Sequence, residues 1–323
     1  MPDKLYLKVG ASTETGYVRK ENQDRMSWIQ LPGGQLYIIA DGMGGHAGGA
    51  KAAELTIQKL EKYLSEASIN LPIEEIIQNA FEKTNLEIYD QAHAGDPATE
   101  GMGSTVAILI IRDHIAKIAH VGDSRVYLYR KEKLQQLTKD HTQVQRMVDA
   151  KMLTPEQARN HPSAHILDHA IGNRPTISVD ISPDLILENG DGFLLCTDGL
   201  SGYVDDHEIE ASLDNSLTPQ ENVDRLINIA LQKGGEDNVT IQFVQYGENS
   251  KVYRKKYRIT LQSIVLFSLI CIFGGEAIYI THQITMNPEE DNVVILKKVI
   301  HQQICTVTQC IGKMTEVTER FLK

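Results

Sequence analysis

Hydrophobic residues follow two different periodicities along the first 247 residues. Short runs rich in β-branched and aromatic residues predict strands, and these runs are 35–40, 105–111, 115–121, 125–130, 193–197 and 239–244. Apolar residues at helical spacing predict helices at 48–64, 73–88 and 218–230. Each predicted helix has one apolar stripe opposite a charged face, which is typical of helices that cover a sheet. Because no long linker interrupts these elements, we expect one domain over residues 1–247.

The links between the central strands are short. Residues 112–114 and 122–124 each separate two predicted strands, and links of that length predict antiparallel neighbours. The fold class is therefore predicted to be α+β with antiparallel sheet. Residues 140–174 differ, because Gln, Arg, His and Asp crowd around short helical turns. Two interpretations fit this stretch: a flap beside an active site, or an ordinary exposed helical excursion.

The composition changes after residue 247. Five Lys or Arg residues in the predicted linker 248–258 precede residues 259–280, in which Glu276 is the one charged residue. That length and the flanking basic cluster predict a transmembrane helix, with an amphipathic or buried helix as the alternative. Positive charge stays on the cytosolic side. We therefore expect the domain over 1–247 to lie in the cytoplasm. A short extracytoplasmic tail would follow over 281–323, in which pairing of Cys305 with Cys310 is an open question.

The N-terminus and the overall charge exclude two further classes. The first residues lack the basic start and apolar run of a secretory signal. The formal net charge of the 323 residues is −11, which disfavours a general affinity for nucleic acid because phosphate-backbone binding needs a basic face. The charge itself points to no particular ligand.

The segment with the clearest chemistry is the glycine-rich turn that follows the first predicted strand. It reads Ala-Asp-Gly-Met-Gly-Gly-His-Ala-Gly-Gly over residues 40–49. A strand end with Asp41 beside Gly42 offers a carboxylate and an accessible carbonyl to a hard cation. Gly42, Gly44 and Ala47 also match the dinucleotide-binding pattern. However, a second helix follows where that fold requires a second parallel strand with a ribose-binding acid.

Four further aspartates, spread over the chain, sit in similar turns. They are Asp24, Asp123, Asp198 and Asp237. A single Asp at a strand end is usually a turn or cap residue. Five of them could instead converge at one end of a sheet sandwich, where carboxylate oxygens would hold Mg²⁺ or Mn²⁺.

At these five motifs, over residues 4–245, the sequence resembles the PPM family of metal-dependent serine/threonine phosphatases, the type 2C phosphatases, and particularly its bacterial branch. The resemblance implies a sandwich of two antiparallel β-sheets flanked by helices, with a metal centre at one edge. It implies that Asp41 bridges two Mn²⁺ or Mg²⁺ ions, and that the Gly42 carbonyl, Asp198 and Asp237 complete their protein ligands.

The same resemblance implies roles for three more residues. Asp24 would hold metal-bound water, Asp123 would form a third and weaker metal site with Asp198, and Arg19 would bind the substrate phosphate. Animal relatives often carry His directly after the Asp-Gly pair, whereas this chain has Met43 there. The general acid is therefore open, and assigning it to His46 would be a guess.

We expect this chain to hydrolyse phosphoserine or phosphothreonine on proteins, with a water activated by two metal ions, at the cytosolic face of a membrane. The expected partners are phosphoproteins and a Ser/Thr kinase signalling pathway; no nucleic acid is expected. Two alternatives stay open: a membrane-anchored scaffold with an inactive phosphatase fold, and an enzyme for small phosphate esters.

Overall fold

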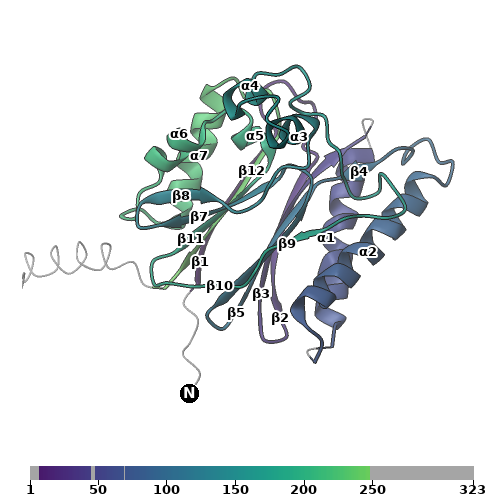
Figure 1. Ribbon diagram of the computed structural model, residues 1–323, viewed down its shortest axis with the longest axis horizontal. Helices are drawn as coiled ribbons and strands as arrows, with labels where there is room; N and C mark the ends of the chain where they lie inside the picture. The colour runs from purple at the N-terminus through teal and green to yellow at the C-terminus, as the bar shows by residue number, and fades with distance from the viewer. Residues whose placement is uncertain (1–6, 45–47, 69, 248–323) are drawn as a thin grey trace, which may run out of the picture. The chain divides into compact units, whose positions relative to one another are not determined.

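The computed structural model describes residues 7–44, 48–68 and 70–247, and within them two antiparallel sheets pack face to face (Figure 1). Sheet A has the strand order β1-β12-β11-β7-β8. Its strands are β1 (Leu7–Glu14), β12 (Val239–Tyr246), β11 (Gly192–Cys196), β7 (Arg125–Arg130) and β8 (Lys133–Gln136). Sheet B has the order β10-β6-β5-β3-β2, with β4 paired to β3 and β9 paired to β6. Its strands are β2 (Asp24–Leu31), β3 (Gly34–Met43), β4 (Gly103–Ser104), β5 (Val106–Arg112), β6 (Ile115–Val121), β9 (Asp180–Ile181) and β10 (Leu185–Ile186).

Helices cover the outer face of each sheet (Figure 1). Sheet B is covered by α1 (Gly48–Glu66) and α2 (Ile73–Ala92), and sheet A by α6 (Asp206–Ser212) and α7 (Pro219–Gln232). Three short helices, α3 (Gln143–Asp149), α4 (Pro155–Arg159) and α5 (Asp198–Ser201), gather at one end of the two sheets. Helix α7 begins where the sequence indicates. Thr218 is its N-cap and forms a capping box with Glu221, and Pro219 is the first helical residue.

Three hydrophobic cores hold these four layers together, and strand alternation explains them. On β5, Ile108 and Ile110 belong to the core under α1 and α2, whereas Leu109 and Ile111 belong to the core between the sheets. On β11, Phe193 and Leu195 face the other sheet and alternate residues face α7. A strand buried on both faces reads as a continuous apolar run. This is why these strands could be predicted from sequence.

The predicted class, two antiparallel sheets flanked by helices, is confirmed. The predicted strands at 115–121 and 125–130 coincide with β6 and β7, and β5 and β6 are antiparallel neighbours as expected. The prediction that β6 and β7 also pair is wrong, because β6 lies in sheet B and β7 in sheet A. The three-residue link turns at Gly122, whose φ of +103° lies outside the range of most side chains, and carries the chain from one sheet to the other.

Among the residues with described structure, no helix combines the length and apolar character needed to cross a membrane. The predicted transmembrane helix at 259–280, the tail with Cys305 and Cys310, and His46 all fall outside the described ranges.

We predict that Phe193→Ala lowers the free energy of unfolding by about 3 to 5 kcal/mol, because it opens a cavity between the sheets where Phe193 is fully buried. Ile186→Ala is the matched control. Ile186 is 72% exposed, so that change should stay within about 0.5 kcal/mol. Chemical denaturation followed by fluorescence of Trp28, the single tryptophan, measures both; equal effects would contradict the described sandwich.

Candidate active site

The five predicted aspartates come from five separate segments and meet at one end of the sandwich. Asp24 begins β2, Asp41 lies near the end of β3, and the two are register partners in sheet B. Asp123 lies in the link from β6 to β7, Asp198 begins α5 after β11, and Asp237 precedes β12. Burial raises the pKa of Asp41 well above its usual value, and the charges of the other four aspartates raise it further. The five aspartates therefore lie in one region of the fold.

Asp24 ties the two sheets together below this cluster. Its side chain is 2% exposed, and its Oδ2 accepts hydrogen bonds of 2.8 Å from the hydroxyls of Thr197 and Thr240. Thr197 directly follows β11 and precedes Asp198, and Thr240 lies in β12 of sheet A, three residues after Asp237. Burial raises the pKa of Asp24 to about 7, while the two hydroxyl bonds act in the opposite direction.

The main chain around Asp41 is fixed from both sides. Its carbonyl accepts bonds from the Thr105 amide at 2.8 Å and the Ser104 hydroxyl at 2.9 Å. Gly42, the next residue, lies where a Cβ atom would come within 2.0 Å of the Gly49 carbonyl oxygen. Only glycine fits there, so the end of β3 can lie against the backbone at the start of α1.

Asn238 positions the segment that carries Arg19. Its side-chain amide donates to the carbonyls of Thr15 at 2.9 Å and Glu21 at 3.0 Å, and its Oδ1 accepts from the Gln23 amide at 2.8 Å. These three bonds hold the 15–23 loop against the start of β12. Asn238 thereby connects the loop to the neighbouring Asp237.

Arg19 reaches into the aspartate cluster from that loop. Its Nη2 donates to Asp237 Oδ2 at 2.7 Å, although the arginine side chain is still 54% exposed. Besides this bond, the charges of Asp237, Asp198 and Asp41 raise the pKa of Arg19. The guanidinium therefore lies beside the carboxylates with donors left for another ligand.

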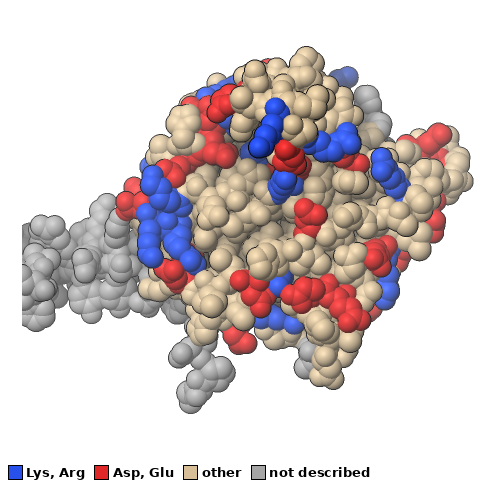
Figure 2. Space-filling view, in the orientation of Figure 1, with Lys and Arg blue, Asp and Glu red and all other residues tan. Residues whose placement is uncertain are grey.

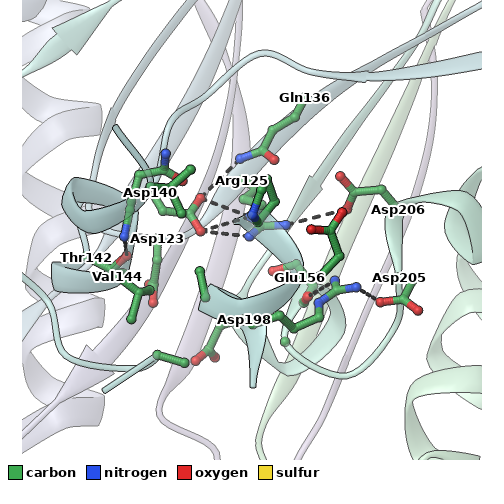
Figure 3. Close-up of a pocket in the computed structure, with 18 of the residues that line it drawn as sticks. Asp123, Arg125, Gln136, Asp140, Thr142, Val144, Glu156, Asp198, Asp205 and Asp206 are labelled. Atoms are coloured by element: carbon green, nitrogen blue, oxygen red, sulfur yellow. Dashed lines mark hydrogen bonds and ion pairs between the residues drawn. The ribbon is translucent and has the colours of Figure 1, made fainter. Parts of the chain in front are cut away.

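Beside the aspartates lies a cavity of about 770 Å³ between α4, α5 and the link from β6 to β7. Asp123, Asp198 and Arg125 are among the residues that line it, and Arg125 lies between Asp140 and Asp206 (Figure 3). His165, from the 140–174 stretch, places its Nδ1 3.5 Å from Asp198 Oδ2. Residues of that stretch thus form one wall of the cavity next to the candidate site.

Charged side chains elsewhere on this face occur mainly as mixed groups. Figure 2 shows Lys and Arg side chains standing next to Asp and Glu. Arg130, for example, pairs with Asp191 at 2.7 Å and with Glu188 at 3.0 Å. Neighbouring charges of both signs largely neutralise one another here. The aspartate cluster is different, because like charges gather there.

A second group of possible metal ligands lies nearby and was not predicted. One ligand atom from each of His120, His141 and Asp180 lies within 4.8 Å of the other two. The strand register places His120 opposite Asp180 on β6 and β9. No sequence spacing connects these residues: the sheet register brings His120 and Asp180 together, and hydrogen bonds with Gly122 hold His141 beside them.

Sequence reasoning also missed the residues that support the aspartates. Thr197, Thr240 and Asn238 hold Asp24 and the Arg19 loop in place. One signal was available: each stands within three residues of a predicted site aspartate at a strand end. Hydroxyl and amide side chains at such positions are usually assigned to turns.

Comparison with known proteins now decides the family. A family model for protein phosphatase 2C matches residues 16–240, a range that holds every aspartate of the cluster. This chain belongs to the protein phosphatase 2C family. The resemblance inferred from the five motifs is therefore confirmed.

Bacterial phosphatases are among the similar proteins. Protein phosphatase PhpP of Streptococcus pneumoniae is 34% identical over 245 residues, which is 75% of this chain and 98% of PhpP. Serine/threonine protein phosphatase PstP of Mycobacterium tuberculosis is 36% identical over 240 residues, or 73% of this chain and 44% of PstP. The matched part of this chain thus covers nearly all of PhpP but less than half of PstP.

Solved structures agree with this assignment. A serine/threonine phosphatase of S. agalactiae has a TM-score of 0.70 and 32% identity, covering 75% of this chain and all of that one, 100%. The catalytic domain of PstP in complex with two manganese ions has a TM-score of 0.65 and 32% identity, over 76% and 100% of the two chains. Both are bacterial phosphatases with the same sheet sandwich.

The raised pKa of Asp24 predicts how pH affects the metal-free protein. The folded state binds the Asp24 proton more tightly than the unfolded state, so this contribution to stability is lost as pH rises towards about 7. Asp24→Asn removes the titration. In a chelating buffer, we expect the wild-type melting temperature to fall between about pH 5 and about pH 8 by roughly 5 °C more than that of Asp24→Asn. Differential scanning calorimetry measures this; parallel curves for the two proteins would contradict it.

Proposed function

We propose that this protein hydrolyses phosphoserine and phosphothreonine on proteins in a reaction that depends on Mn²⁺ or Mg²⁺. The observation that carries the proposal is the convergence of four aspartates, from distant parts of the chain, on Asp41. The similar proteins are named serine/threonine phosphatases, and one solved relative holds two manganese ions. Together these support a metal-dependent phosphoprotein phosphatase.

The residues present suit divalent cations. Asp24 Oδ1 and Asp198 Oδ1 are buried and have no hydrogen-bond partner among the described residues. Burial raises the pKa of Asp41 and of Asp237, and like charges raise both further. Bound cations would relieve that repulsion. Hard cations such as Mg²⁺ and Mn²⁺ prefer carboxylate and carbonyl oxygens. The donor set therefore fits.

Two such ions would be held by Asp41, which would serve both, and by the Gly42 carbonyl, Asp198 and Asp237. A third, weaker ion would use Asp123 together with Asp198. Asp24 lies behind this group and would orient water through its free oxygen.

Once bound, a pair of such ions lowers the pKa of a coordinated water and neutralises charge on the phosphoryl oxygens. Arg19 would bind the phosphate, because its planar fork suits two phosphate oxygens and one of its nitrogens is already fixed by Asp237. Cys196 is unsuited to nucleophilic catalysis, since burial raises the pKa of its thiol to about 12.

Two alternatives carry less support. A scaffold with an inactive phosphatase fold has no need to keep five aspartates together against their mutual repulsion. An enzyme for small phosphate esters would use the same centre, and substrate competition separates it from a protein phosphatase.

We predict that the full chain hydrolyses a phosphothreonine peptide only when Mn²⁺ or Mg²⁺ is added, and that Asp41→Asn lowers kcat by more than about 100-fold. Changing residues that merely support metal ligands already costs about 10- to 100-fold, and Asp41 is assigned as a ligand of both ions. Release of inorganic phosphate measures the rate.

Asp113→Asn is the matched control. Asp113 is an exposed strand-end aspartate in the turn between β5 and β6, with a φ of +51° that Asn also adopts readily. It should keep wild-type activity. Peptide hydrolysis without any divalent ion, or equal rates in the two variants, would refute the proposal. Preferential turnover of a small phosphate ester in competition with the peptide would favour the alternative enzyme.

We also propose that residues 259–280 anchor the protein in the cell membrane, with the catalytic domain in the cytoplasm. The support is the apolar length of that segment and the basic residues before it. Such a location would place the enzyme beside a membrane-bound Ser/Thr kinase pathway, an assignment that rests on family analogy alone.

Protease added to intact spheroplasts should then remove the tail after residue 281 and leave the catalytic domain whole. Immunoblotting with epitopes at both ends of the chain detects this. Release of the entire chain by a high-salt wash would rule out the spanning helix.

A further inference from the structure

Two consecutive residues, Asp140 and His141, hold the link that carries Asp123. Asp140 accepts three hydrogen bonds from the Arg125 guanidinium, at 2.9 and 3.2 Å from Nε and at 2.7 Å from Nη2. The His141 amide donates to the Gly122 carbonyl at 3.0 Å, and the Gly122 amide donates back to His141 Nδ1 at 3.2 Å. Residues on both sides of Asp123 are therefore fixed by one dipeptide.

The Gly122 bond determines which nitrogen of His141 carries the proton. A backbone amide can only donate, so Nδ1 must offer its lone pair, and the proton of the neutral ring lies on Nε2. That nitrogen is 3.3 Å from Asp180 Oδ2. The ring therefore joins Gly122 on one side to Asp180 on the other.

Neighbouring residues restrict movement of this ring. The His120 ring lies against it, with centroids 4.6 Å apart, and His120 Nε2 donates to the Lys139 carbonyl at 2.8 Å. His169 approaches edge-on at 5.5 Å. The His141 side chain is only 10% exposed.

The same residue also connects to the 140–174 stretch. The Asp168 amide donates to the His141 carbonyl at 2.7 Å, and the Gln143 amide donates to the Ile166 carbonyl at 2.9 Å. The two ends of the segment that forms the cavity wall thus meet at His141. The cavity wall and the link that carries Asp123 are therefore both attached to His141.

We propose that His141 is a positioning residue: through its Nδ1 it holds the Gly122 amide, and so fixes the carboxylate of Asp123 where the weakest metal ion binds. This inference rests on the proposed function, because it assigns a metal to Asp123. It differs from treating His120, His141 and Asp180 as a metal site of their own. In that case Nε2 of His141 would have to give up its proton while Nδ1 still faced a donor.

Two amide substitutions of His141 distinguish the role of Nδ1 from that of Nε2. In His141→Asn, the amide oxygen lies near the position of Nδ1 and keeps an acceptor for Gly122. In His141→Gln, the amide reaches the position of Nε2 and keeps the contact with Asp180 but not with Gly122. The readout is Mn²⁺ binding to the metal-free full chain, measured from the electron paramagnetic resonance signal of free Mn²⁺. Asp123→Asn identifies the ion that depends on Asp123.

For His141→Gln we expect the affinity for that ion to fall about tenfold, which equals about 1.4 kcal/mol, while the tighter ions are unchanged. His141→Asn should stay within about threefold of wild type, since a retained acceptor keeps the amide satisfied. Asp180→Asn should bind Mn²⁺ like wild type, because its amide oxygen still accepts from Nε2. Melting curves in a chelating buffer check that each variant folds.

Several results would overturn the inference. Equal losses in the Asn and Gln variants, or a larger loss in Asn, would show that the Gly122 bond is not what matters. If Asp180→Asn lost a bound ion that Asp123→Asn still binds, then His120, His141 and Asp180 would themselves form a metal site. A wild-type chain that binds no Mn²⁺ and releases no phosphate would instead refute the proposed function, and the role of His141 with it.

Discussion

Repulsion among carboxylates is the constraint on which the rest of this structure depends. Burial raises the pKa of Asp41 well above the ordinary range, and the charges of Asp24, Asp123, Asp198 and Asp237 raise it further. Such a group spreads apart unless the fold prevents it or cations neutralise it. Here the fold contributes rigid strand ends and hydrogen bonds from neutral side chains. Bound cations would relieve that repulsion.

The two sheets share this task. Asp24 and Asp41 are partners on adjacent strands of sheet B, whereas Asp198 and Asp237 stand at strand ends of sheet A. Thr197 and Thr240 cross between the sheets by donating to the same oxygen of Asp24. The inter-sheet core of large apolar residues therefore supports the site directly, because any shift of one sheet against the other would separate the carboxylates.

Polar side chains next to the aspartates hold the neighbouring loops in place by hydrogen bonds. Asn238 donates both hydrogens of its side-chain amide to the loop that carries Arg19. Asp140 and His141 hydrogen-bond to Arg125 and Gly122, on either side of Asp123. Loops positioned by a rigid scaffold are where function concentrates. In this member of the phosphatase 2C family, the strands bring the acids together and a small set of amide, carboxylate and imidazole contacts fixes the segments between them.

The sequence by itself determined the fold class, the buried strands and the identity of the converging aspartates, because strands buried on both faces read as apolar runs and an ordered set of aspartate turns is specific. It did not reveal β1 and β2, which lie at sheet edges and carry mixed polar residues. It also suggested that β6 pairs with β7, although the link at Gly122 crosses between sheets. Only the tertiary structure decided that crossing, the bonds of Thr197, Asn238 and His141, and the approach of His120 to Asp180. The reason is that sheet register and packing join residues far apart in the chain, and local patterns carry no information about such contacts.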